Sequence, residues 1–261
     1  MRKMISIMLV IAIASSCAVK GIAASGYSDI ISSINDSVED MYNGAESAPQ
    51  QTQAMAFGAM YMLYVLESEI DTDRSRTSTV SDLVSSITDS ASSAEGAPQV
   101  SALSLYGCVA ILGAIAYEKD TFGVYQEFIS QTINSLTDAN TTSAPQEMAN
   151  AAYRMVDMLT ILAYIEGVDS SLISNVNDTL SENNQNLSGA PQQTANGLYR
   201  AAELLYLISQ KAYSSTVSGL IYDLLDEMYT ANDSCNSAVQ QTTNGMSTIY
   251  YMLMMLAMAK A

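Results

Sequence analysis

The sequence predicts an all-α protein of five tandem two-helix repeats. One observation is a phrase that occurs five times, as SAPQQTQAMAFGAMYMLYVLE from Ser47 and SGAPQQTANGLYRAAELLYLISQK from Ser188. The other is an amphipathic segment before each copy. The four prolines of the chain mark the first four copies, at positions 49, 98, 145 and 191, and Val239 replaces proline in the fifth. The resulting period of 46–49 residues is typical of arrays of helical hairpins.

The first residues predict an export signal over residues 1–24. A basic start, Arg2 and Lys3, precedes the apolar stretch MISIMLVIAIA, which is too short to span a bilayer. We expect cleavage near residue 24 and a single repeat domain over residues 25–261. A second interpretation is a lipoprotein signal that ends before Cys17, although Ala14 stands where leucine is usual. A third is an uncleaved anchor.

Each copy of the phrase predicts the inner helix of a hairpin. Proline is favoured in the first turn of a helix, where its missing N–H breaks no hydrogen bond. The residues that follow are apolar nearly all round, which predicts burial on more than one side. The segments between copies carry apolar residues three and four apart, with Ser and Asp outward, so they predict amphipathic outer helices. The expected hairpins span residues 27–69, 77–119, 121–166, 168–211 and 213–260.

The repeats predict how the hairpins assemble. One hairpin cannot bury both faces of its inner helix, whereas a stack of five builds a continuous core. Two architectures satisfy this requirement. We expect an open α-solenoid, and the alternative is a closed αα-ring in which the last hairpin meets the first.

The composition excludes several classes of function. The net charge of −17 repels nucleic-acid phosphates and anionic lipids, so we expect no nucleic-acid partner and membrane contact only through a lipid anchor. Without histidine, no Ser-His-Asp or Cys-His arrangement exists. We therefore expect no catalytic residues, no metal and no cofactor. Cys108 and Cys235 lie too far apart in an open stack to bridge, so we expect free thiols.

A glutamine holds one position in every copy. The five residues are Gln50, Gln99, Gln146, Gln192 and Gln240. Stacked repeats would align these amides, and we expect a structural ladder of hydrogen bonds between repeats at the helix ends. The alternative is a polar strip that binds a saccharide or a peptide.

A tyrosine, an arginine and an acid recur together in two copies. They are Tyr153, Arg154 and Asp157 in the third copy and Tyr199, Arg200 and Glu203 in the fourth. The second copy keeps the aromatic, Tyr106, with Gly107 at the arginine position. The simpler interpretation is an i, i+3 ion pair worth a few tenths of a kcal/mol. The sharper one is a ligand-binding patch whose guanidinium groups hold a carboxylate or sulfate.

The last inner helix is apolar on every side, although a terminal repeat normally presents a polar outer face. It predicts an interaction surface of Ile249, Tyr250, Leu253, Met254 and Leu256. The first hairpin would cover this helix in a ring, and a second copy would cover it in a homo-oligomer.

Taken together, these features predict an exported, non-enzymatic helical repeat protein that acts as a binding or assembly module at the cell envelope or outside the cell. Its partner would be a protein or an anionic or saccharide ligand. One alternative is a structural subunit that polymerises through its last helix. The other is a carbohydrate-active enzyme of the αα-ring type, which needs two acids facing a ring cavity, roughly 5–10 Å apart.

Overall fold

The structure is a computed structural model that describes residues 27–70, 77–94, 96–138 and 143–260. Within these ranges it has ten helices and no strand. The outer helices are α2 (Tyr27–Asn43), α4 (Thr77–Ser92), α6 (Gln126–Asp138), α8 (Ser170–Gln185) and α10 (Ser215–Asp233). The inner helices are α3 (Ala48–Ile70), α5 (Ala97–Lys119), α7 (Ala144–Ile165), α9 (Ala190–Ala212) and α11 (Ala238–Met258). The predicted all-α fold of tandem hairpins is confirmed; the expected signal over residues 1–24, with Cys17, lies outside the described residues.

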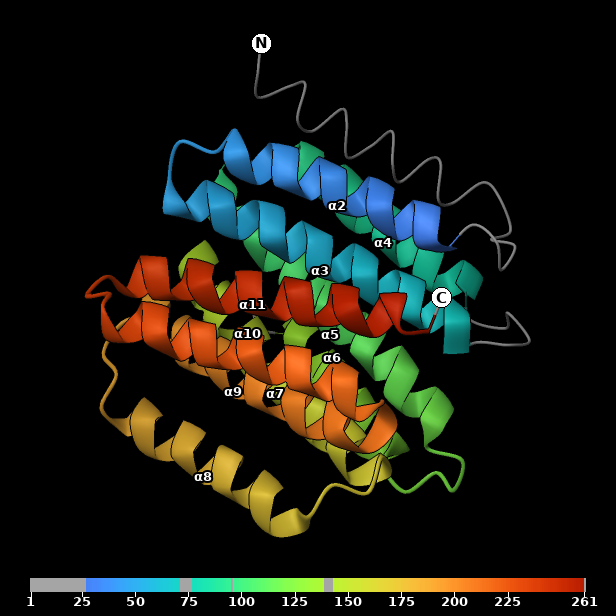
Figure 1. Ribbon diagram of the computed structural model, residues 1–261. Coiled ribbons are helices and arrows are strands. Elements are labelled where there is room, and N and C mark those ends of the chain that lie inside the picture. Colours follow the sequence, from blue (N-terminus) through green and yellow to red (C-terminus); the bar gives the residue numbers. More distant parts are fainter. Residues whose placement is uncertain (1–26, 71–76, 95, 139–142, 261) are drawn as a thin grey trace.

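The five inner helices pack side by side in a ring. Each contacts the next in chain order, and α11 packs against α3 as extensively as the sequential neighbours pack against each other. Figure 1 shows α11 lying along α3, although the two belong to opposite ends of the chain. The outer helix α2 also contacts α11. The contacts between the first and last hairpins therefore match the closed αα-ring rather than the open solenoid.

Small residues and buried hydroxyl groups allow the ring to close. A Cβ atom on Gly58 of α3 would lie 2.6 Å from a ring carbon of Tyr250, so only glycine leaves room for this tyrosine. Tyr250 is fully buried, and its hydroxyl donates to Asn35 Oδ1 of α2 at 3.0 Å. At the start of the same two inner helices, Thr243 Oγ1 donates to the carbonyl oxygen of Ala48 at 3.1 Å.

Closure changes the role of the last helix. Ile249, Tyr250, Leu253 and Leu256 are at most 3% exposed, because α3 and α9 cover them within the same chain. These four residues cannot form the surface that the sequence predicts, and Met254 alone of the five is partly exposed. The all-round apolar character of α11 is thus explained by its position inside the ring.

The other inner helices are buried for the same reason. Among the described helices, only α5 is long and apolar enough to cross a membrane, and 72% of that apolar stretch is buried inside the ring. The outer helices bury one stripe each; in α2 this stripe includes Ile31, Ile34 and Val38. Outer helices contact inner helices and not one another.

Candidate functional site

A cavity of about 90 Å³ lies at the end of the ring where the inner helices begin. Every hairpin lines it with the same two positions, the residue that follows the first helical residue and the residue three further on. The pairs are Pro49 and Thr52, Pro98 and Ser101, Pro145 and Met148, Pro191 and Thr194, and Val239 and Thr242. The cavity is therefore a property of the closed ring and does not exist in any single repeat.

The walls of this axial cavity are apolar in spite of their hydroxyl groups. Thr52 Oγ1 donates to the carbonyl oxygen of Ala48 at 3.0 Å, and Ser101 Oγ donates to that of Ala97 at 2.8 Å. Thr194 makes the same bond one turn back along α9. Hydroxyl groups used within their own helices leave carbon atoms to face the cavity, beside the proline rings. None of the lining residues is ionisable, so the cavity suits an apolar group.

Proline explains why a helix start can face an apolar space. The first turn of a helix leaves backbone N–H groups without partners inside the helix, and proline has no N–H to leave unpaired. The sequence analysis used these prolines only as signs of helix starts. Their common position in four repeats is the signal that, together with ring closure, locates the cavity.

The Tyr–Arg residues of the third hairpin occupy the side of α7 that faces outer helix α8. The Tyr153 hydroxyl donates to Asn184 Oδ1 of α8 at 2.7 Å. Arg154 Nη1 lies 2.9 Å from Asp157 Oδ2, and the two side chains are 42% and 33% exposed. Burial raises the pKa of the Asp157 carboxyl, and the hydrogen bond and charge of Arg154 oppose this rise. The expected i, i+3 ion pair is present.

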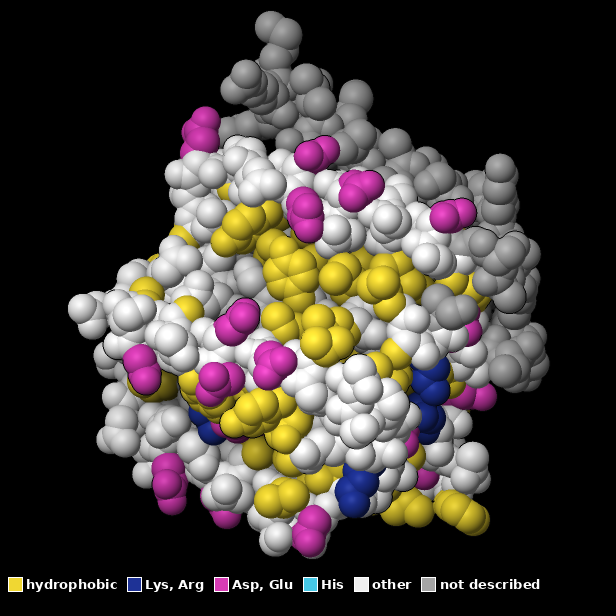
Figure 2. All heavy atoms as spheres, in the orientation of Figure 1, with side chains coloured by type: hydrophobic (Ala, Val, Ile, Leu, Met, Phe, Trp, Pro, Cys, Tyr) yellow, Lys and Arg dark blue, Asp and Glu magenta, His cyan; other side chains and the backbone are white. Residues whose placement is uncertain are grey.

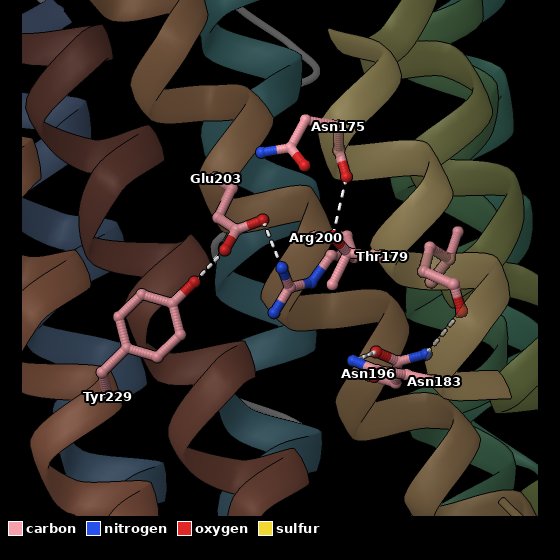
Figure 3. A network of polar contacts seen from close by, with 8 residues as sticks. Asn175, Thr179, Asn183, Asn196, Arg200, Glu203 and Tyr229 are labelled. Carbon is pink, nitrogen blue, oxygen red and sulfur yellow. Dashed lines mark hydrogen bonds and ion pairs between the residues drawn. The ribbon is translucent and has the colours of Figure 1, made fainter. Parts of the chain in front are cut away.

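The corresponding residues of the fourth hairpin lie between α8 and α10 (Figure 3). Arg200 Nη1 is 2.7 Å from Glu203 Oε2, and these side chains are only 12% and 18% exposed. The Tyr229 hydroxyl of α10 donates to the other carboxylate oxygen of Glu203. Burial, and then the bond to Glu203 and its charge, raise the pKa of Tyr229. Arg200 Nε is buried without a hydrogen-bond partner.

The remaining aromatic candidates are also partly buried. Burial raises the pKa of Tyr106, and the nearby charge of Glu147 adds to the shift. The Tyr199 hydroxyl is buried without a partner, and burial is the main cause of its raised pKa. The two guanidinium groups do not meet at one ligand position, because each is bound by the acid of its own helix.

The repeated glutamines form their hydrogen bonds inside their own hairpins. Gln50 Oε1 accepts from the Glu46 backbone N–H at 2.8 Å, and Gln146 and Gln240 each donate to the asparagine four residues on. Asn244 then donates to Asn232 of the preceding outer helix at 2.9 Å. Where these bonds are described, the amides tie an inner helix to its own outer helix and loop. The expected bonds between repeats are instead made by threonines near the cavity, among them Thr243.

Two further expectations concern chemistry. Cys108, which is buried, and Cys235 are free. Among the described residues, no group of three or more potential ligands could hold a metal ion. The carbohydrate-enzyme alternative requires two acids at a ring cavity, and the residues that line the axial cavity include none. Comparison with protein families, with curated proteins and with solved structures finds no match.

Proposed function

We propose that this chain is an exported, non-enzymatic binding module that takes an apolar group of its partner into the axial cavity. One observation supports the proposal above the others: all five repeats supply the same two positions to one apolar cavity. Apolar pockets shaped by the whole fold are the usual places where proteins bind small ligands or anchoring side chains.

The chemistry of the cavity sets the kind of group that it accepts. A charged group would lose its hydration and find no polar partner there, at a cost of several kcal/mol. An aliphatic or aromatic group loses only its contact with water, which is favourable. An enclosed apolar cavity of about 150 Å³ binds benzene, so an open cavity of about 90 Å³ suits a single ring with one edge outside.

The test uses fluorobenzene as a probe, followed by its ¹⁹F NMR signal. We expect saturable binding to the chain with a Kd on the order of 1 mM, as befits so small a ligand. Ser101→Met should weaken binding at least tenfold by filling the cavity. Met148 already occupies the same repeat position, so the fold tolerates methionine there.

A matched control separates filling of the cavity from loss of a hydroxyl. Ser90→Met removes an equivalent bond to the carbonyl oxygen four residues back, but on the exposed side of α4. This variant should bind fluorobenzene like the unaltered chain. No saturable binding, or equal binding by Ser101→Met, would contradict the proposal.

A further inference from the structure

The turn between α5 and α6 displays two apolar side chains to solvent. Phe122 is 91% exposed and Val124 is 70% exposed, the highest values among the large apolar residues that the structure describes. Figure 2 shows hydrophobic side chains projecting at the corner of the molecule where Figure 1 places this turn. Exposed side chains of this size mark an interaction surface when they occur together.

The turn is held in a fixed shape. The Asp120 carboxylate, only 6% exposed, accepts hydrogen bonds from the backbone N–H groups of Val124 at 3.0 Å and Tyr125 at 2.6 Å. Gly123 has a φ of 69°, which most residues adopt at a cost. A buried acid and a glycine therefore fix the backbone on both sides of Phe122. The phenyl ring is presented outward by a built turn, and binding would cost little loss of backbone freedom.

More aromatic residues surround the base of this turn. Tyr117, Phe128 and Tyr164 are 36%, 49% and 38% exposed, at the end of α5, in α6 and at the end of α7. Tyr125 stacks on Tyr164 with ring centroids 6.4 Å apart. Phe122 is thus the projecting member of a wider aromatic surface, which supplies further contact area to anything that covers the phenyl ring.

Phe122 and the axial cavity lie at opposite ends of the ring. Pro98, which lines the cavity, begins α5, and the turn follows the end of the same helix. A helix of 23 residues is about 34 Å long. Each copy of the chain therefore carries an exposed phenyl ring at one end and, at the other, an apolar cavity of a size that suits one ring.

We propose that Phe122 of one copy inserts into the axial cavity of a second copy, so that the chain assembles head to tail. A contact between two different surfaces of one molecule leaves a free phenyl ring and a free cavity at the two ends, so it builds open chains rather than closed dimers. The net charge of −17 opposes this association and is screened by salt. The inference rests on the proposed function, because it names the partner of the same cavity.

Complementation between two variants tests the proposal, with full chains throughout so that residues 1–26 are the same in every sample. Phe122→Ser keeps the cavity and loses the inserted group, and Ser101→Met keeps the phenyl ring and loses the cavity. Sedimentation velocity should show the unaltered chain growing beyond dimers between about 10 µM and 1 mM, and more so at 0.5 M than at 0.05 M salt. Each variant alone should stay monomeric, and an equimolar mixture should stop at dimers.

Several results would overturn head-to-tail assembly. They are a monomeric unaltered chain at 1 mM, undiminished growth of either variant, or a mixture without dimers. Leu220→Ser, which removes another exposed apolar side chain from α10, should assemble normally. Phe122→Ala and Thr194→Met serve as second variants if either of the first fails to give the normal helical spectrum. Fluorobenzene binding by a chain that does not assemble would keep the proposed function and reject only the second copy as partner.

Discussion

The ion pairs of the third and fourth hairpins occupy the same repeat position but are held in different ways. Arg154 and Asp157 are 42% and 33% exposed, whereas Arg200 and Glu203 are 12% and 18% exposed. The difference comes from the following outer helix. Tyr229 of α10 reaches Glu203, while the position 48 residues earlier in α8 is Ser181, which is bonded to the Asn177 carbonyl oxygen of its own helix.

Packing of the outer helices explains the rest of the contrast. α10 packs closely against α9, whereas α8 makes only slight contact with α7. In the first two hairpins the arginine position is glycine, and a Cβ atom on Gly58 or Gly107 would meet side chains of neighbouring helices at less than 3 Å. A single position of the repeat thus holds a close helix contact, an exposed ion pair or a buried one, depending on the neighbouring helix. Repeated sequence therefore does not imply repeated energetics.

The largest expected effect tests the buried pair. Arg200→Ala leaves Glu203 with Tyr229 as its remaining partner in a poorly hydrated position, so the free energy of unfolding should fall by about 2–4 kcal/mol. Arg154→Ala is the matched control, because its partner stays in contact with water, and it should cost below about 1 kcal/mol. Urea unfolding followed by circular dichroism measures both. Equal losses would show that burial does not distinguish the two pairs.

The next effect isolates the contribution of α10. Tyr229→Phe removes the hydroxyl that donates to Glu203 and keeps the ring, so we expect a loss of about 1.5–3 kcal/mol, as for hydrogen bonds to charged groups. Tyr222→Phe on the same helix changes a half-exposed tyrosine and should be nearly neutral. In an Arg200→Ala background, the loss from Tyr229→Phe should change, because both groups bind the same carboxylate. Simple additivity of the two losses would count against a shared network.

The sequence predicts the hairpins well and their closure poorly, for identifiable reasons. The period and the prolines locate inner helices because those signals are local. Closure depends on contacts such as Gly58 with Tyr250, which lie far apart in the chain and follow from the small rotation between neighbouring hairpins. The apolar last helix was a sign of closure, since a helix that is apolar all round needs cover on several sides. That sign fits a ring and an oligomer equally well.

The candidate sites divide in the same way. The i, i+3 pairs are readable from spacing alone, and both are present. The partner of Glu203, Tyr229, is on a different helix and has no marker in the sequence. The axial cavity needs five separated prolines and valine to meet, so a single repeat gives no indication of it. Exposure of Phe122 is likewise invisible in a chain whose other apolar residues are mostly buried.

The smallest expected effect concerns the pH dependence of the exposed pair. Burial raises the pKa of Asp157 above its ordinary value of about 3.9, with Arg154 opposing the rise. Between these two values the folded chain keeps a proton that the unfolded chain has lost. The free energy of unfolding therefore falls as pH rises through this window, and the penalty is relieved below it. The effect is small because Asp157 is one-third exposed.

Asp157→Asn removes this titration, so the unaltered chain should gain stability relative to the variant as pH is lowered from 7 towards 3.5. Urea unfolding of both chains across that range measures the difference. In an Arg154→Ala background the opposing charge is gone, so the window should extend to higher pH. A difference that is flat with pH, or that grows in favour of the variant under acid conditions, would mean that Arg154 outweighs burial. The exposed pair would then stabilise the fold as the buried pair does, and the contrast between the two hairpins would be one of degree.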